Sequence, residues 1–267
     1  MKILIPVDFS ENSKRALEFA IFLARKKDAS ITILHVIEAI YDFAAQAAVV
    51  IEGMHRDAEM LLEEMVKTYD ESGVTIDYLI KEGTVSIMTA KTAEELDVNF
   101  IVIGMQGSSG ITKKLLGNFT IEIVKESTKP VLLIPSEANV TQIQKVTLAL
   151  EFADHEEAFL KWIIEMSQRW ELNLEFLHIQ TKENFQEKLS LLGLEQFIKK
   201  NHPDLAVKLH TFYAAKLDEG LNKFLEENET TILVMCHQHK NLWEQILSRS
   251  KSIQMAYHTH VPLLIMN

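Results

Sequence analysis

The sequence is poor in cysteine, in glycine and in long apolar runs. Its 267 residues include a single cysteine, Cys236, which excludes a framework of intrachain disulfides and suits a reducing compartment. No apolar run approaches the length that crosses a bilayer. The opening stretch, MKILIPVDFSE, lacks the long apolar core and the small-residue cleavage site of a secretory signal. We therefore expect a cytoplasmic protein with no membrane partner.

Basic residues are also scarce. There are 27 lysines and arginines against 38 aspartates and glutamates, which gives a formal net charge of −11. A nucleic-acid backbone requires a basic face, so this balance argues against nucleic acid as a partner. It leaves room for a local basic pocket that holds one small anion.

The chain does contain a regular alternation of short apolar runs and amphipathic stretches. Apolar runs rich in branched residues indicate strands buried on both faces, and apolar residues at helical spacing indicate helices. In the first half the predicted strands are 2–7, 29–36, 74–80, 100–104 and 131–134, and the predicted helices are 11–27, 55–68, 84–96 and 117–127. Strands separated by helices pair in parallel, so the pattern predicts an α/β fold.

The second half of the chain repeats this order. The echoes are KVTLALEF (145–152) of KILIPVDF (2–9), LEFLHI (174–179) of ITILHV (31–36), TILVM (231–235) of FIVIG (100–104), and THVPLLI (259–265) of TKPVLLI (128–134). Echoes that keep their order along the chain predict a duplication. The polar segment SEANVTQ, residues 136–142, is the predicted linker, so we expect two domains, 1–136 and 143–267.

Glycine is concentrated in one loop. Four of the nine glycines lie in GMQGSSGITKKLLGN, residues 104–118, between a predicted strand and a predicted helix. Ligands gather beyond the carboxyl ends of strands in an open parallel sheet, and glycine lets backbone N–H groups approach an anion. The start of the following helix and the nearby Lys113 and Lys114 add positive character, so the loop suits a phosphate group. A plain glycine-rich turn is the alternative, because neither a Walker loop nor the dinucleotide fingerprint is present.

Asp8 ends the first predicted strand, which lies beside the fourth strand if the strand order reverses between them. A carboxylate at that point accepts hydrogen bonds from ribose hydroxyls or from an exocyclic amine. Asp8 could instead cap the first helix together with Ser10, and the two roles are compatible.

A resemblance to the universal stress protein family is carried by four segments in order: ILIPVDFSENSKRALEFA, ITILHV, IVIGMQGSSGITKKLLGNFT and STKPVLLIP. The loop of that family, Gly-x2-Gly-x9-Gly-Ser/Thr, corresponds here to Gly104, Gly107, Gly117 and Asn118. The resemblance covers residues 1–135 with every landmark and the second half weakly. It implies two tandem, doubly wound, five-stranded parallel sheets of strand order 3-2-1-4-5, flanked by helices.

The resemblance further implies an adenine nucleotide as ligand, ATP or else AMP or ADP, with Mg²⁺ bridging the phosphates. In nucleotide-binding members the strand ends contact adenine and ribose, and the loop holds the phosphates. The positions carried over to this chain are Pro6, Val7, Asp8, Val36, Ile103, Gly104, Gly107, Gly117, Asn118, Phe119 and Thr120. Asn118 departs from the Ser or Thr of the family; its amide can still cap a helix and donate, and Thr120 can supply a hydroxyl nearby.

The second half lacks the glycine loop. Its equivalent stretch, residues 234–250, contains no glycine, with Cys236 in place of Gly104 and Glu151 in place of Asp8. We therefore expect a degenerate copy that binds no nucleotide and pairs with the first domain. The last strand of each half is short, apolar and at an edge in the implied order, which invites an intramolecular pseudo-dimer and leaves homo-oligomers open.

Two further features have competing interpretations. The segment CHQH, residues 236–239, suggests metal, but Cys236 follows a strand whereas His258 and His260 precede one. These groups should lie at opposite ends of the sheet, so no metal site is expected. The apolar residues 38–54 either extend the second helix or form a flap over the adenine.

Two histidines, His35 and His178, end matching strands of the two halves. Neither has an obvious nucleophile partner in the sequence, so a structural role is expected for both.

Together these features predict a stress-response regulatory protein that binds an adenine nucleotide in its first domain. No positioned general base for an attacking water is evident, so we expect no enzyme activity beyond slow ATP hydrolysis. The alternative is a nucleotide-free interaction scaffold that uses its two domains as an intramolecular pseudo-dimer. An ATP-pyrophosphatase is disfavoured because no Ser-Gly-Gly loop follows the first strand.

Overall fold

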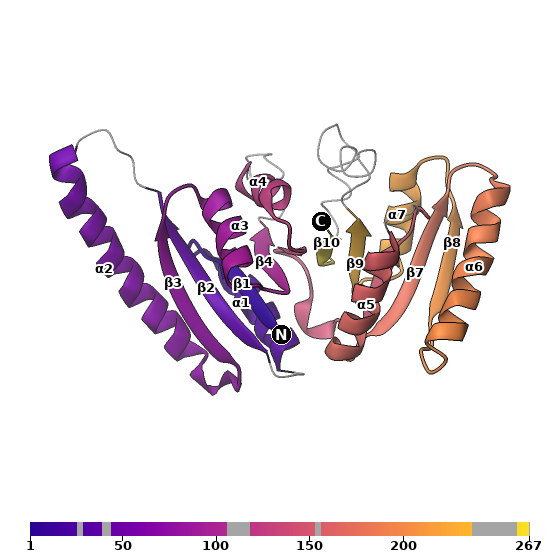
Figure 1. Ribbon diagram of the computed structural model, residues 1–267, viewed down its shortest axis with the longest axis horizontal. Helices are drawn as coiled ribbons and strands as arrows, with labels where there is room; N and C mark the ends of the chain where they lie inside the picture. Colours follow the sequence, from indigo (N-terminus) through magenta and orange to yellow (C-terminus); the bar gives the residue numbers. More distant parts are fainter. Residues whose placement is uncertain (26–28, 39–43, 106–117, 153–155, 237–260, 267) are drawn as a thin grey trace.

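A computed structural model describes residues 1–25, 29–38, 44–105, 118–152, 156–236 and 261–266. Its strands form one sheet in the order β3-β2-β1-β4-β5-β10-β9-β6-β7-β8, which runs along the long axis of the molecule (Figure 1). The strands are β1 (Lys2–Pro6), β2 (Ser30–Ile37), β3 (Thr75–Glu82), β4 (Phe100–Met105), β5 (Val131–Pro135), β6 (Lys145–Ala149), β7 (Asn173–Gln180), β8 (Lys208–Tyr213), β9 (Thr231–Cys236) and β10 (Leu263–Met266).

Each half of the sheet has the predicted strand order. The first half reads β3-β2-β1-β4-β5, the second reads β8-β7-β6-β9-β10, and neighbouring strands within each half pair in parallel. The α/β fold class and the order 3-2-1-4-5 are therefore confirmed. The structure adds that the two five-stranded sheets are continuous with one another and form one ten-stranded sheet, joined through the two short apolar edge strands.

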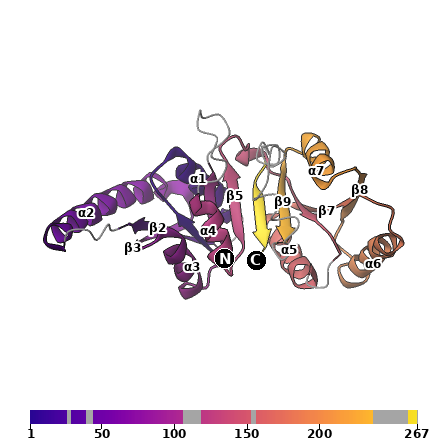
Figure 2. The same ribbon diagram turned by 90° about the horizontal axis from the view of Figure 1, so that it is seen from above.

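The two halves join through their last strands. β5 and β10 pair in antiparallel fashion, with Leu132 opposite Leu264 and Val131 opposite Ile265. Figure 2 shows these two strands side by side in the middle of the molecule. Every residue of both strands is buried. Each strand thereby covers the apolar edge that the other would expose, which explains why two such short strands can be wholly apolar.

Helices cover both faces of the sheet. They are α1 (Glu11–Ala24), α2 (Ala44–Thr68), α3 (Val85–Glu95), α4 (Asn118–Glu126), α5 (Glu156–Trp170), α6 (Phe185–Asn201) and α7 (Leu217–Glu226), with 3-10 turns at Asp70–Ser72 and Val140–Gln142. Helices α1, α2, α5 and α6 share one buried cluster, and α3, α4 and α7 share the other. Alternating side chains of a strand enter opposite clusters, as Ile3 and Leu4 of β1 do, so a continuous apolar run is what this doubly covered sheet requires.

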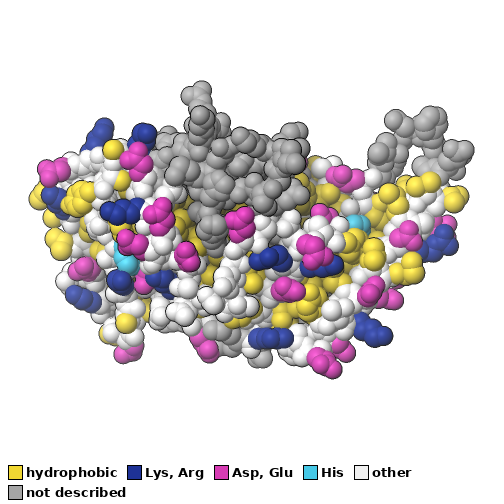
Figure 3. All heavy atoms as spheres, turned by 180° about the vertical axis from the view of Figure 1, so that it is seen from behind, with side chains coloured by type: hydrophobic (Ala, Val, Ile, Leu, Met, Phe, Trp, Pro, Cys, Tyr) yellow, Lys and Arg dark blue, Asp and Glu magenta, His cyan; other side chains and the backbone are white. Residues whose placement is uncertain are grey.

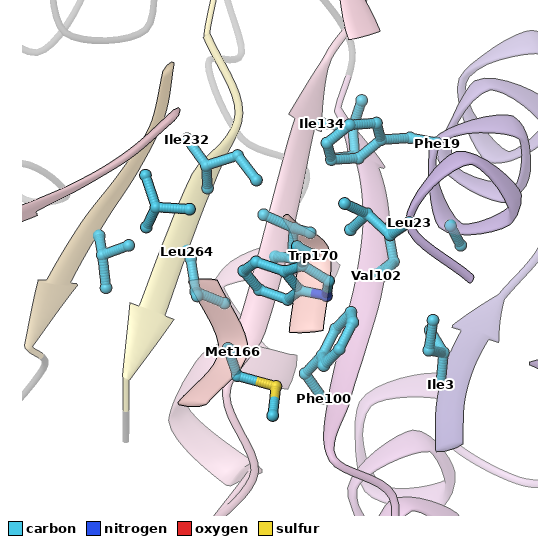
Figure 4. Close-up of a cluster of buried hydrophobic side chains, with 14 of the residues drawn as sticks. Ile3, Phe19, Leu23, Phe100, Val102, Ile134, Met166, Trp170, Ile232 and Leu264 are labelled. Carbon is cyan, nitrogen blue, oxygen red and sulfur yellow. The ribbon is translucent and has the colours of Figure 1, made fainter. Parts of the chain in front are cut away.

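The larger cluster crosses the junction between the halves. Trp170, at the end of α5, is fully buried and packs edge-on against Phe100 of β4 at a centroid distance of 5.6 Å (Figure 4). Trp162, on the same helix, packs edge-on against Trp170 at 6.2 Å. One aromatic side chain of the second half is therefore part of the core of the first half.

Most differences from the sequence prediction concern element ends. α2 begins at Ala44 rather than at 55, so residues 44–54 extend the second helix, in agreement with one of the two interpretations given above. Residues 39–43 lie outside the described part of the chain. β10 covers Leu263–Met266, which coincides with the apolar end of the echo THVPLLI, and residues 259–260 lie outside the described part of the chain. The domain bounds 1–136 and 143–267 stay a prediction.

No helix in the described ranges is long and apolar enough to cross a membrane.

Candidate functional site

The candidate site lies where the strand order reverses in the first half. β1 pairs with β2 on one side and with β4 on the other, and the chain leaves β1 and β4 in opposite directions along the sheet. Asp8 comes two residues after β1 ends at Pro6, and Gly104 is the penultimate residue of β4. The structure thus places Asp8 and the start of the glycine loop at the carboxyl ends of two neighbouring strands, which is the usual ligand position in an open α/β sheet.

The Asp8 carboxylate is exposed and ordered by the turn into α1. Its Oδ1 accepts a hydrogen bond from the backbone N–H of Ser10 at 3.0 Å. Ser10 is the N-cap of α1, where its Oγ accepts from the N–H of Ser13 at 3.3 Å, and the Ser13 hydroxyl donates back to the Ser10 carbonyl at 2.9 Å. The capping residue is therefore Ser10, and Asp8 supports the cap from outside the helix.

These contacts set the charge of Asp8. Partial burial is the largest single influence and would raise the pKa, but hydrogen bonds from Ser10 and Ser13 together outweigh it, so the pKa of Asp8 is lowered. Asp8 consequently presents a charged, exposed acceptor at neutral pH.

A histidine clamp holds the end of β1 to β2. The N–H of Val7 donates to the carbonyl of Leu34 at 2.8 Å, and His35 Nδ1–H donates to the carbonyl of Val7 at 2.9 Å. Phe9, two residues after Val7, has a positive φ of 61°, and its ring packs against the His35 ring at a centroid distance of 4.6 Å. A bulky residue in the left-handed region costs about 1–3 kcal/mol, so the clamp imposes this turn on the chain that presents Asp8.

The second half contains the same clamp. Leu150 N–H donates to the carbonyl of Leu177 at 2.9 Å, and His178 Nδ1–H donates to the carbonyl of Leu150 at 3.0 Å. Phe152 again has a φ of 61° and packs on His178 at 5.0 Å. Because the clamp persists in a half without the glycine loop, it belongs to the fold rather than to ligand binding. These contacts are consistent with the structural role expected for both histidines.

The two clamps differ at the outer ring nitrogen. His178 Nε2 lies 3.2 Å from the Glu187 carboxylate of α6, whose other oxygen accepts from the Asn184 amide at 3.0 Å. His178 is buried, whereas His35 is half-buried. In the second half the outer ring nitrogen of the clamp histidine is therefore occupied by the Glu187 carboxylate.

Gly104 has a packing role that the sequence did not reveal. A Cβ at Gly104 would lie 1.9 Å from the carbonyl oxygen of Asn12 and 2.4 Å from its carbonyl carbon. The first turn of α1 therefore rests directly on the β4 backbone, and only glycine allows this approach. In the second half Cys236 is the counterpart of Gly104, because Cys236 of β9 pairs with Met266 of β10 as Gly104 of β4 pairs with Ile134 of β5.

The other predicted residues are placed as follows. Val36 and Ile103 are buried near the carboxyl ends of β2 and β4. Asn118 is the first residue of α4, Phe119 packs at the margin of the smaller cluster, and Thr120 is buried at 5% exposure. Gly107 and Gly117, like Lys113 and Lys114, lie outside the described residues, so the phosphate-binding part of the site stays a prediction.

Metal ligands do not converge in the described part of the chain. No group of three or more His, Cys, Asp or Glu side chains there could hold a metal ion. Cys236 is buried. His239, His258 and His260 lie outside the described ranges, so the expectation that CHQH forms no metal site stays untested.

Comparison with known proteins gives matches for both the sequence and the structure. The sequence profile of the Universal stress protein family matches residues 1–135. A universal stress protein of Bacillus subtilis is 28% identical over 144 residues, which cover 50% of this chain and 97% of that protein. Universal stress protein G of Salmonella typhimurium is 33% identical over 139 residues, which cover 49% of this chain and 96% of that protein.

Among solved structures, a universal stress protein from Archaeoglobus fulgidus superimposes with a TM-score of 0.81 at 20% identity. The superposition covers 99% of this chain and 97% of the archaeal one. At that identity the likeness concerns the fold, and it extends over both halves. A two-half arrangement of this kind therefore occurs in a second protein.

Proposed function

Since the chain belongs to the universal stress protein family, we propose that its first half binds an adenine nucleotide and that the protein acts in a stress response by regulation rather than catalysis. The observation that carries the proposal is the exposed, charged Asp8 carboxylate just beyond the carboxyl end of β1, which pairs with β4. A carboxylate held charged at a switch point is suited to accept hydrogen bonds from ribose hydroxyls.

The remaining contacts follow from the position of Asp8. Backbone groups of Pro6, Val7 and Val36 border the adenine and ribose, and those of Ile103 and Gly104 run along the ribose. In this proposal the backbone amides of Gly107 and Gly117 contact the phosphates, and α4, which begins at Asn118, adds the positive end of its dipole. Phe119 and Thr120 complete the set through the first turn of α4. The described residues fit the nucleoside end of ATP, ADP or AMP, and Mg²⁺ would be held by the phosphates rather than by a protein cage.

We propose little or no hydrolysis at this site. A general base must reach an attacking water beyond the terminal phosphate. The imidazole of His35 donates through Nδ1 to the carbonyl of Val7 and packs against the ring of Phe9, so its contacts serve the clamp.

A second candidate function is a nucleotide-free interaction scaffold in which the halves act as an intramolecular pseudo-dimer. The observation that favours it is the buried antiparallel pairing of β5 with β10. In that case the glycine loop would be a structural turn, and the packing role of Gly104 would be the whole reason for that glycine.

Isothermal titration calorimetry with ATP, ADP and AMP, each with and without Mg²⁺, tests the proposal. We expect saturable binding of one nucleotide per chain. Asp8→Ala should weaken binding by roughly tenfold or more, because a hydrogen bond to a charged acceptor is worth about 1.5–3 kcal/mol. Gly107→Trp should abolish binding by filling the space for the phosphates.

Glu151→Ala provides the matched control, because Glu151 takes the place of Asp8 beside the second clamp. The affinity of the Glu151→Ala variant for nucleotide should equal that of the parent. No binding by the parent at millimolar nucleotide would refute the proposal and leave the scaffold. Equal losses in Asp8→Ala and Glu151→Ala would place the nucleotide elsewhere.

A further inference from the structure

The two outer helices each expose an apolar stripe. α2 and α6 lie at opposite ends of the long axis (Figure 1), and hydrophobic side chains are exposed at both of these ends (Figure 3). On α2 the exposed residues of the stripe are Val50, Met54 and Leu61, and on α6 they are Phe185, Leu189 and Leu192. Each helix buries a different face against the sheet, through Leu62 and Met65 on α2 and through Ile198 on α6. The residues of the two stripes are therefore not part of the hydrophobic core of the single chain.

The stripes have the same spacing. Positions i, i+4, i+7, i+11 and i+14 form the seam of a two-stranded coiled coil. All five positions are exposed on both helices. On α2 they are Val50, Met54, Asp57, Leu61 and Glu64, and on α6 they are Phe185, Leu189, Leu192, Gln196 and Lys199.

A parallel pairing of α2 with α6 in this register brings apolar residues together at one end and opposite charges together at the other, whereas in the middle Asp57 meets Leu192 and Leu61 meets Gln196. Val50 meets Phe185 and Met54 meets Leu189 at the amino-terminal end. At the carboxyl-terminal end Glu64 meets Lys199, and the neighbouring Lys200 is also exposed.

The net charges of the two helices have opposite signs. α2 has five acidic and two basic residues, whereas α6 has three basic and two acidic ones. Pairing α2 with a second α2 would instead bring two acidic helices together, which disfavours a symmetric contact through this face.

The orientation of the helices permits this pairing between chains. Each helix follows the carboxyl end of a strand, α2 after β2 and α6 after β7, and Figure 1 shows both amino-terminal ends on the same side of the molecule. A second molecule placed beyond the α2 end therefore brings its α6 to α2 of the first with both amino-terminal ends on the same side, and a rotation aligns the two helix axes, which are inclined in opposite senses in Figure 1. Such a contact uses different surfaces on the two partners, so it can repeat from chain to chain.

We propose that a second copy of this chain occupies the α2 stripe through its α6 stripe, which gives head-to-tail assembly. This proposal does not depend on nucleotide binding. Sedimentation velocity over a range of chain concentrations tests it on the full chain. The weight-average mass should exceed 30.5 kDa and rise with concentration past twice that value. The association should weaken between ~0.05 M and ~0.5 M NaCl, because the Glu64–Lys199 contact is screened.

Two single variants and their mixture distinguish head-to-tail assembly from a symmetric contact. Val50→Glu removes the α2 stripe and Leu192→Glu removes the α6 stripe, and each variant alone should be monomeric. Each still has the surface that the other lacks. An equimolar mixture should therefore form a complex of twice 30.5 kDa and no larger species.

A charge reversal checks the register. Glu64→Lys or Lys199→Glu should each raise the dissociation constant by roughly threefold or more, and the double variant should recover the parent value.

The matched control is Val49→Glu. Val49 and Val50 are adjacent, chemically identical and similarly exposed, at 69% and 58%, but a helix turns them about 100° apart. Val49→Glu should assemble like the parent, and circular dichroism should show all variants folded. A parent that is monomeric at every concentration overturns the proposal. So does a Leu192→Glu variant that still dimerises alone, a mixture that stays monomeric, or a Val49→Glu variant as defective as Val50→Glu.

Discussion

Replacement of Gly104 by alanine tests whether this glycine serves packing in the absence of any ligand. The added Cβ would lie 1.9 Å from the carbonyl oxygen of Asn12, whereas ordinary van der Waals contact begins at 3.4 Å. The shortfall of 3.4 − 1.9 = 1.5 Å falls on backbone atoms of both β4 and α1, so no side-chain rotation relieves it.

The cost follows from what must move. A displacement of the first turn of α1 disrupts the Ser10 cap, which is worth about 1 kcal/mol. Overpacking of a tight contact costs about 1–3 kcal/mol more. We therefore expect Gly104→Ala to lower the free energy of unfolding by about 2–4 kcal/mol.

Urea denaturation followed by circular dichroism, without nucleotide, measures this change as a shift of the midpoint at constant slope. Gly193→Ala on α6 is the control, because a Cβ there meets nothing within 4 Å and alanine is favoured over glycine inside a helix by about 0.5–1 kcal/mol. A Gly104→Ala variant as stable as the parent would refute the packing argument. Gly104 would then be explained by ligand approach alone.

Three further predictions concern other parts of the molecule. Because the folded-state pKa of Asp8 lies below its ordinary 3.8, Asp8 contributes stability that is present above that value and is lost as the pH falls through the lowered pKa. The stability difference between the parent and Asp8→Asn should therefore shrink when unfolding is measured at neutral pH and then at about pH 3. Trp170→Ala should cost about 3–5 kcal/mol in thermal or urea unfolding, whereas Trp170→Phe should cost clearly less, because the buried indole N–H has no hydrogen-bond partner among the described residues. Glu175→Leu should lower the free energy of unfolding by about 2–4 kcal/mol, because it removes the carboxylate that lies 3.3 Å from Lys145 Nζ and 2.9 Å from His210 Nε2 in a mostly buried network. Adding Lys145→Met to this variant should recover part of the loss in the same assay.

Much of the fold could be predicted because a parallel sheet covered on both faces has a strong sequence signature. Continuous apolar runs such as KILIP are typical of strands buried on both faces, and the repeated order of runs identified the two halves. Element ends were less certain. The helical pattern was clear only from residue 55, and residues 38–54 were left as either an extension of the helix or a flap, because the alanine-rich stretch from Ala44 shows little amphipathic contrast. In the structure α2 begins at Ala44 and continues through Gly53.

The site was predicted less completely than the fold. Asp8 and Gly104 were both marked by the sequence, but Gly104 was assigned only to the ligand, because the distance between β4 and the first turn of α1 is a property of packing that no local pattern encodes. The clamp was missed for a similar reason. The pairing of His35 with the carbonyl of Val7, and of His178 with that of Leu150, depends on strand register, and the two positive-φ phenylalanines have no residue-type signal.

The pairing of β5 with β10 has a consequence for how this protein responds to dilution. Two separate chains held by such strands would exchange partners and come apart at low concentration, whereas tethered halves meet at an effective concentration in the millimolar range. The half that contains the glycine loop is therefore paired with the half that lacks it at every expression level. Pairing at this seam between two halves that both contain the loop is disfavoured by the same tether.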